Sequence, residues 1–362
     1  MKDTILFGDC RESLKTIATS DTKARMCVTS PPYYGLRDYG TATWIGGDPN
    51  CNHRRDTKVK PENCNTGHKN HDDMAGVGDA IYKTVCPKCG AIRQDSQIGL
   101  EQTPEDYVKE MVKVFSLVRD CLTDDGTLWL NIGDSYYNYR SDGNYPKQTV
   151  SKTRQDLPQS TPVRGNKLEG LKQKDLIGIP WMLAFALRAD GWYLRQDIIW
   201  HKPNPMPESV KDRCTKAHEY IFLLSKSKNY YYDNEAIKEP AKDWGTRDRT
   251  NGKYHNPGSG LAPHSGLTKS YATKNKRSVW SVTVKPYKGA HFATYPEDLV
   301  EPCILAGSEK GDIVLDPFMG SGTTAMVAKK NSRSYLGCEL REEYASLQTA
   351  RISTIPNKLP LY

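Results

Sequence analysis

The chain has 362 residues, which is enough for one large α/β domain or two ordinary ones. Its mean hydropathy is negative, and no apolar run approaches the roughly 20 residues of a membrane span, so the composition argues against a membrane protein. The apolar stretch near the N-terminus is too short for a signal peptide, and we therefore expect a cytoplasmic protein.

The net charge of +8 is unevenly distributed. Residues 234–290 contain eleven Lys or Arg and four Asp or Glu, so nearly the whole excess lies in this segment. A local basic excess suits the phosphate backbone of a nucleic acid, and Lys274, Lys276 and Arg277 form its densest patch. Charge alone leaves open the alternative of a solvated loop with an incidental surplus of cations.

The ten cysteines do not suggest a disulfide scaffold. Several have the spacing of metal ligands, whereas others, such as Cys27 and Cys121, lie in apolar runs. A reducing compartment fits this usage better than an oxidising one.

Apolar runs predict buried strands at 24–29, 126–132, 197–200, 220–224, 313–315 and 335–337. Helical patterns fall between them, at 104–121, 179–189, 296–306, 323–330 and 341–352. The first helix opens with Thr103, Pro104 and two acidic residues, which is typical of a capped N-terminus. Strands that alternate with helices predict an α/β fold with a mainly parallel sheet covered on both faces.

Three stretches do not fit that pattern: 45–98, 138–176 and 240–290. All three are polar or rich in turn residues. Long irregular segments in a compact domain are usually functional or disordered, so we expect insertions that carry recognition or mobile elements.

A glycine-containing loop follows the strand that ends at Leu315. It consists of Asp316-Pro317-Phe318-Met319-Gly320-Ser321-Gly322-Thr323-Thr324 and opens a helix. Its glycines allow a tight turn close to a ligand, and the helix N-terminus supplies free N–H groups. The spacing is not that of a dinucleotide or P-loop motif. Glu339, at the end of the next strand, can accept two hydrogen bonds from a ribose diol. Together these parts suit an adenosine cofactor without a pyrophosphate, whereas the loop alone could be a simple helix cap.

A second loop, Ser30-Pro31-Pro32-Tyr33, follows the strand 24–29. The prolines fix the backbone and lack N–H donors, which leaves carbonyl oxygens free to accept. The exocyclic amine of a nucleobase is a poor nucleophile because its lone pair is delocalised into the ring. Ser30 Oγ and the Pro31 carbonyl could accept its two N–H bonds and direct the lone pair at a methyl donor. Alone, the motif could be a Pro-Pro turn.

These two loops, in this order, resemble those of the β-class amino-methyltransferases of DNA, a circularly permuted family. Residues 8–10, 126–134, 213–224 and 291–296 also resemble family segments. The resemblance implies a Rossmann-like methyltransferase fold with a seven-stranded, mainly parallel sheet and a zinc-binding insertion. It also implies S-adenosylmethionine as the cofactor and double-stranded DNA as the partner, in a prokaryotic or phage-infected cell.

The resemblance divides the chain and assigns residues to the cofactor. The implied parts are 1–44 and 99–233 for the catalytic half, with a polar loop at 138–176, then 45–98 for the insertion, 234–290 for target recognition and 291–362 for the cofactor half. The implied cofactor residues are Asp9, His291, Phe292, Thr294, Asp316, Phe318, Gly320, Ser321, Gly322, Thr323, Thr324 and Glu339.

Ser30 resembles the residue at the first catalytic position of cytosine-N4 enzymes, whereas adenine-N6 members more often carry Asp or Asn there. We therefore expect methylation of a flipped cytosine at N4, with adenine N6 as the alternative. Cytosine-C5 methylation needs a covalent cysteine after a proline. Cys303 follows Pro302, but it lies in the apolar helix 296–306, so we expect a core residue.

Four residues in the first insertion have the spacing of a structural zinc site: Cys51, His53, Cys86 and Cys89. Gly90 would allow the tight turn that directs both thiolates of the Cys-x2-Cys half at one metal ion. Cys64, His68 and His71 offer a rival set, and unpaired cysteines in a polar loop are the alternative to any site. A zinc ion would explain how a polar insertion stays ordered.

Two other functions remain open at this point. One is a zinc-containing DNA-binding protein without catalysis. The other is methylation of RNA or of a protein glutamine, whose enzymes carry Asn in place of Ser30. The recognition sequence, a partner restriction endonuclease and the oligomeric state are not determined by the sequence.

Overall fold

The computed structural model describes residues 1–35, 42–53, 82, 85–95, 97–137, 168–241, 272–284 and 295–355. At its centre is one sheet with the strand order β1-β12-β11-β2-β5-β7-β6-β10. The strands are β1 Thr4–Phe7, β2 Ala24–Thr29, β5 Leu122–Ile132, β6 Tyr193–His201, β7 His218–Ser225, β10 Val279–Ser281, β11 Ile313–Asp316 and β12 Ser334–Glu339.

The sheet is parallel except at β7, which runs antiparallel to both of its neighbours. The mainly parallel α/β sheet expected from the sequence is confirmed, but the expected number of seven strands is wrong. An eighth strand, the short β10, pairs with β6 at the edge of the sheet. It lies within a polar stretch of sequence, where three residues leave no periodicity to detect.

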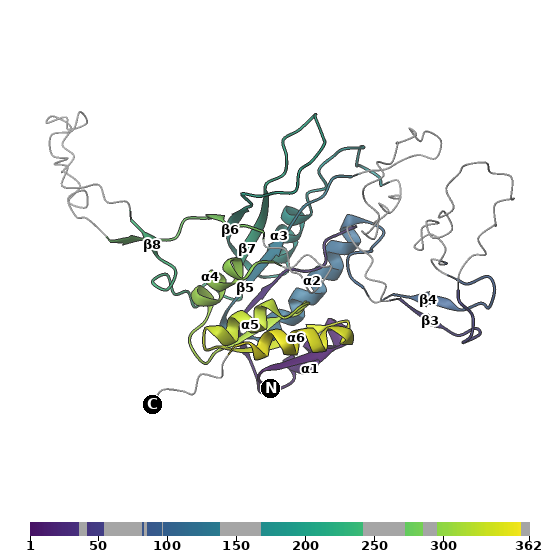
Figure 1. Ribbon diagram of the computed structural model, residues 1–362, viewed down its shortest axis with the longest axis horizontal. Helices are drawn as coiled ribbons and strands as arrows, with labels where there is room; N and C mark the ends of the chain where they lie inside the picture. Colours follow the sequence, from purple (N-terminus) through teal and green to yellow (C-terminus); the bar gives the residue numbers. More distant parts are fainter. Residues whose placement is uncertain are drawn as a thin grey trace, which may run out of the picture.

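Helices cover both faces of the sheet (Figure 1). One core cluster packs α1 Cys10–Ala18, α2 Pro104–Cys121 and α3 Ile179–Ala189 against one face. The other cluster packs α4 Glu297–Gly307, α5 Thr323–Lys330 and α6 Ala345–Ser353 against the opposite face. Alternation along the strands explains the two cores. In β2, Cys27 belongs to the first cluster, whereas Met26 and Val28 belong to the second.

The helices at 104–121, 179–189 and 323–330 have the predicted bounds. In α2 the Thr103 side chain accepts a hydrogen bond from the Asp106 N–H, and Pro104 occupies the first turn. The predicted helix 341–352 instead starts with a 3-10 turn, Glu342–Tyr344, before α6. The sequence analysis missed β1 and α1. Both are short, and β1 is an edge strand with a partly exposed pattern.

Two short antiparallel pairs lie outside the central sheet. The first joins β3 Thr43–Ile45 to β4 Ile92–Gln94, and the second joins β8 Glu239–Pro240 to β9 Thr273–Lys274. In Figure 1 the β3–β4 hairpin and β8 project from opposite sides of the molecule. Among the helices that the structure describes, none is long and apolar enough to cross a membrane.

Candidate functional site

The two sequence motifs meet at the carboxyl ends of neighbouring central strands, and we call this end of the sheet the motif edge. The Ser30–Tyr33 loop follows β2, the glycine loop follows β11, and these strands are parallel neighbours. The Thr29 hydroxyl donates to Asp316 Oδ1 at 2.6 Å, which joins residues 287 positions apart. The edge lies where the strand order changes direction, and open α/β sheets bind ligands at such switch points.

Asp316 holds this junction together. Its side chain is completely buried, and its oxygens accept from the hydroxyls of Thr29, Thr324 and Tyr295 and from the Phe318 N–H. Burial raises the pKa of Asp316, and these hydrogen bonds oppose the rise. The sequence analysis assigned Asp316 to the cofactor. Its contacts here are with the protein, and they position the glycine loop.

The glycine loop adopts a conformation that favours glycine. Gly320 and Gly322 have φ values of +52° and +82°. The loop is supported from behind by α6, where Gln348 Nε2 donates to the Gly320 carbonyl at 2.7 Å. Arg351 Nη1 donates to the hydroxyls of Ser321 and Thr323 at 2.6 and 3.0 Å. The sequence analysis missed both supporting residues, although their i, i+3 spacing places them on one helix face.

Glu339 closes the other side of this loop. Its carboxylate accepts from the Gly320 N–H at 2.8 Å and from the Arg341 N–H at 2.9 Å. The residue is only 8% exposed, and burial raises the pKa of Glu339 to about 7. A carboxyl group with this pKa changes its charge near neutral pH.

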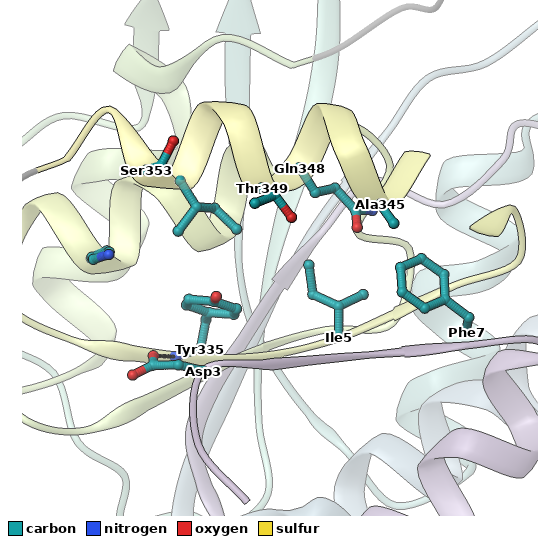
Figure 2. A pocket seen from close by; sticks show the side chains of 10 residues that line it. Asp3, Ile5, Phe7, Tyr335, Ala345, Gln348, Thr349 and Ser353 are labelled. Carbon is teal, nitrogen blue, oxygen red and sulfur yellow. Dashed lines mark hydrogen bonds between the residues drawn. The ribbon is translucent and has the colours of Figure 1, made fainter. Parts of the chain in front are cut away.

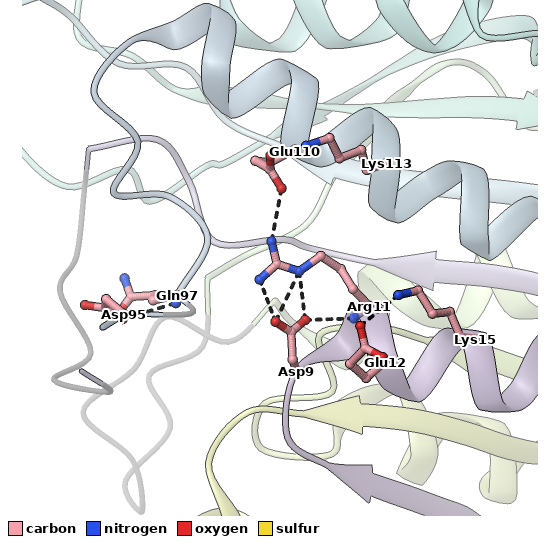
Figure 3. A network of polar contacts seen from close by, with 8 residues as sticks. All are labelled: Asp9, Arg11, Glu12, Lys15, Asp95, Gln97, Glu110 and Lys113. Carbon is pink, nitrogen blue, oxygen red and sulfur yellow. Dashed lines mark hydrogen bonds and ion pairs between the residues drawn. The ribbon is translucent and has the colours of Figure 1, made fainter. Parts of the chain in front are cut away.

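Asp9 lies at the end of β1, beside Glu339. The Gly8 N–H donates to the Glu339 carbonyl at 2.9 Å, and Phe7 is paired with Glu339 in the sheet. In Figure 3 the Arg11 guanidinium donates hydrogen bonds to the Asp9 carboxylate. It also donates to Glu110 at 3.0 Å. Burial would raise the pKa of Asp9, but the hydrogen bonds and charge of Arg11 outweigh it and lower the pKa. Asp9 is therefore held as a fixed anion.

The catalytic loop is fixed through Tyr33. Its hydroxyl donates to Glu219 Oε2 at 2.7 Å and lies 3.3 Å from Asn131 Oδ1. Burial raises the pKa of Tyr33 well above its usual value, and the Glu219 carboxylate raises it further. A Cβ at Gly133 would lie 2.7 Å from the Tyr33 ring, so only glycine allows this approach. The Pro32 carbonyl, just before Tyr33 in the same loop, accepts a hydrogen bond from the Tyr107 hydroxyl at 2.9 Å.

Glu219 reaches this edge because β7 runs antiparallel to β5. The first residues of β7 therefore lie beside the last residues of β5, with Tyr220 opposite Ile132. Lys202, just after β6, forms an ion pair with Glu219 and lies 4.3 Å from the centre of the Trp200 ring. The family resemblance covers residues 213–224, which include Glu219, but it did not predict the bonds of Glu219 to Tyr33 and Lys202.

The predicted metal ligands converge in the connection between β3 and β4, just beyond the paired strands. One ligand atom from each of Cys51, His53, Cys86 and Cys89 lies within 4.8 Å of the others. The Cys51 and Cys86 sulfurs are 3.8 Å apart, and Cys89 Sγ is 3.5 Å from His53 Nδ1. Tetrahedral zinc with Zn–S bonds of about 2.3 Å would place two sulfurs about 3.8 Å apart, so the spacing fits such an ion.

The surroundings of the cluster also suit a metal site. Gly90 has a φ of +74°, and its N–H donates to the Cys86 carbonyl at 2.7 Å, which makes the turn between the two thiols. The ring of Trp44 stacks on His53 with 4.3 Å between centroids. The rival ligands Cys64, His68 and His71 lie outside the described residues, as do the cofactor candidates His291, Phe292 and Thr294.

The three basic residues singled out in the sequence lie on and beside β9. Arg277 Nε bonds to Glu239 at 2.7 Å, and Lys274 lies 3.7 Å from the same carboxylate. Lys276 lies 5.0 Å from the centre of the Trp280 ring. Glu239 therefore offsets part of the positive charge of this patch.

Cys303 lies in the second core cluster on α4, as expected, and burial raises its thiol pKa. None of the nine cysteines in the described segments forms a disulfide.

A cavity of about 400 Å³ lies between α6 and the edge strand β1 (Figure 2). Its lining includes Gln348 but none of the predicted catalytic or cofactor residues, so it is separate from the motif edge.

The chain is similar in sequence to known DNA methyltransferases. The N6/N4 methyltransferase family model, described as DNA methylase, matches residues 24–350. The type II methyltransferase M.SmaI of Serratia marcescens is 41% identical over 353 residues, which cover 96% of this chain and 90% of the relative. M.Cfr9I of Citrobacter freundii is 39% identical over 349 residues, covering 96% and 87%.

Among solved structures, the PvuII DNA methyltransferase (cytosine-N4-specific) is similar to this chain with a TM-score of 0.53. The sequence identity is 16%, and the match covers 99% of this chain and 88% of that one. At this identity the likeness supports the fold alone.

Proposed function

The chain belongs to the N6/N4 DNA methylase family, and from that membership we propose that it methylates cytosine at N4 in double-stranded DNA, with S-adenosylmethionine as the methyl donor. The observation that carries the proposal is the junction between Thr29 and Asp316. It holds a loop suited to a nucleobase amine beside a loop suited to an adenosine cofactor, as transfer between two bound molecules requires.

In this proposal the catalytic loop binds the amine. Ser30 Oγ and the Pro31 carbonyl accept its two N–H bonds and turn the nitrogen lone pair towards the methyl donor. The Tyr33 ring stacks on the base, which must leave the duplex because its amine is otherwise paired. The hydrogen bond from the Tyr33 hydroxyl to Glu219 supports this role, since it fixes the ring before the base arrives.

The cofactor supplies an electrophilic methyl group on a sulfonium. Glu339 is proposed to accept the ribose hydroxyls and Asp9 the adenine amine, since both carboxylates lie at the ends of neighbouring strands. The glycine loop lies between them and the catalytic loop, and the donor set suits an adenosine without phosphate. The further proposed contacts are Phe318, Gly320, Ser321, Gly322, Thr323 and Thr324, with His291, Phe292 and Thr294 from the segment before α4.

The choice of cytosine N4 over adenine N6 rests on Ser30. A serine hydroxyl at this position resembles the cytosine-N4 enzymes, and adenine N6 is the alternative product. Circular permutation is part of the proposal, since the catalytic loop comes first in the chain and the cofactor loop last.

Two accessory roles complete the proposal. A zinc ion is held by Cys51, His53, Cys86 and Cys89. Its role is structural, because four protein ligands leave no open coordination position for catalysis. Lys274, Lys276 and Arg277 contact DNA phosphates, with Glu239 reducing their combined charge. A restriction endonuclease that cuts the same site is a further proposed partner, because the relatives are type II methyltransferases.

Product analysis tests the proposal directly. DNA from cells that express the protein is digested and its nucleosides are separated by mass spectrometry. We expect N4-methylcytosine, and Ser30→Ala should lower kcat roughly tenfold to a hundredfold, because one hydrogen bond to the reacting amine is lost. The variant should still bind DNA and cofactor.

Other products decide between the alternatives. N6-methyladenine would keep the enzyme class and overturn the choice of base. 5-Methylcytosine would overturn the mechanism, which has no covalent cysteine step. DNA without any modified base would favour a DNA-binding protein that lacks catalysis.

A further inference from the structure

The connection between β6 and β7 leaves the sheet at the same edge as the catalytic loop. β6 ends at His201 and β7 begins at His218, and in Figure 1 the connection projects beyond these strands. The Lys202 N–H donates to the Ala217 carbonyl at 2.8 Å, which closes the base of the loop. Residues 203–216 therefore project from the site.

Both stems of this loop contact the residues that hold the catalytic loop. On one side, Lys202 pairs with Glu219, which in turn accepts from the Tyr33 hydroxyl. On the other side, Lys216 Nζ donates to the Asp134 carbonyl at 2.8 Å, next to Gly133. The loop base and the Tyr33 ring are thus parts of one bonded unit.

The loop is stiff. Pro203, Pro205 and Pro207 fix φ at every second position. Between the first two, the Asn204 side chain makes two hydrogen bonds of 3.0 Å to the backbone of Val284.

The returning part of the loop is braced as well. Arg213 forms an ion pair with Glu208 and lies 3.8 Å from the centre of the Tyr136 ring. Lys174 bonds to Asp212 at 2.6 Å. Contacts therefore support both sides of the loop.

Met206 lies between Pro205 and Pro207, in the part of the loop that leaves β6. It is 83% exposed, more than any other large apolar side chain in the described part of the chain. A lone exposed apolar residue is common on protein surfaces, but this one is presented on a braced loop beside the site where a base must be received.

We infer that Met206 is a wedge that enters the DNA base stack when the target base leaves it. A flipped base leaves a gap in the stack, and methionine is among the apolar side chains that proteins insert between base steps. A stiff loop loses little conformational entropy on insertion. The inference rests on the proposed function, since it requires a flipped base, but it holds for either cytosine or adenine as the target.

The test compares Met206→Ala with Phe185→Ala, an exposed apolar control. Phe185 is 47% exposed and lies on α3, a helix that packs on one face of the sheet. The recognition duplex is first identified from the methylated positions in DNA of cells that express the wild-type protein. Two duplexes are then used, one with the target base normally paired and one with it opposite a mismatch, each with 2-aminopurine beside the target.

On the paired duplex, Met206→Ala should lower the single-turnover rate roughly tenfold or more and reduce the rise in 2-aminopurine fluorescence. On the mismatched duplex its rate should return to within about twofold of the wild type, because the base is already unpaired. Phe185→Ala should match the wild type on both. A Met206→Ala rate equal to wild type on the paired duplex, or an equal defect on both duplexes, would overturn the wedge. Failure of the wild type to methylate DNA would instead remove the proposed function.

Discussion

At the scale of single residues, Glu339 shows how burial prepares a group for its task. Its carboxyl is almost fully buried, which raises its pKa to about 7, while two backbone N–H groups hold it in place. Between pH 4.5 and about 7 the proton is bound in the folded chain but not in the unfolded one. The contribution of Glu339 to the free energy of unfolding therefore falls as the pH rises through this range.

The same pKa predicts pH-dependent cofactor binding. If Glu339 binds the cofactor as proposed, the ribose hydroxyls donate to its ionised carboxylate. The affinity for S-adenosylmethionine should then rise as the pH increases from 6 to 8, by at most about tenfold per pH unit. In Glu339→Gln the affinity should be lower at pH 8 and nearly independent of pH. Titration calorimetry at several pH values measures both. An equally steep pH dependence in the variant would show that another group titrates.

At the scale of elements, the β3–β4 hairpin depends on contacts other than those of the core. β3 and β4 pair only with each other among the strands that the structure describes, and Ile45 and Ile92 on them are exposed. A two-stranded hairpin is at best marginally stable in water. The Cys51–His53–Cys86–Cys89 cluster lies where the connection leaves the two strands, and a metal ion bound there would stabilise the pair.

Metal analysis of the purified protein should find one zinc ion per chain. Cys86→Ser should lose most of it, whereas Cys214→Ser should retain it, since Cys214 is an exposed cysteine outside the cluster. The main unfolding transition should change little in either variant, because the hairpin is not part of the central sheet. Wild-type protein without zinc, or full zinc content in Cys86→Ser, would contradict the assignment.

At the scale of the whole molecule, the sheet joins the two ends of the chain. β2 is close to the N-terminus and β11 close to the C-terminus, yet they are neighbours, and Thr29 and Asp316 share a buried hydrogen bond between them. Asp316 also binds Tyr295 and Thr324, so the order of the cofactor loop depends on a residue of the catalytic strand.

Thr29→Val should lower the free energy of unfolding by about 1–3 kcal/mol, because a buried carboxylate loses one donor. It should also weaken cofactor binding by disturbing the loop that Asp316 positions. Thr127→Val is the control, since Thr127 is equally buried but accepts from Trp129 on β5. It should lose stability and keep its cofactor affinity. Urea unfolding and calorimetry provide the two measurements, and cofactor binding by Thr29→Val equal to wild type would refute the coupling.

The sequence by itself determined the features that short windows contain. The caps and periodicity of α2 lie within its own residues, and the chemistry of Ser30–Tyr33 and of the glycine loop is visible in each motif. The spacing of the cysteines and histidines predicted the four metal ligands, but it left Cys64, His68 and His71 as a rival set. Glu339 was identified from its place at the end of the next strand, whereas Asp9 was added only by the family resemblance.

Only the tertiary structure decided which of these pieces meet. The hydrogen bonds from Gln348 and Arg351 to the glycine loop depend on how α6 packs. The hydrogen bond from Tyr33 to Glu219 depends on β7 being antiparallel to β5. The strands β1 and β10 are too short for a pattern, so sheet pairing alone defines them. The physical reason is the same in each case: these contacts join residues far apart in the chain, and their energy exists only once the sheet has formed.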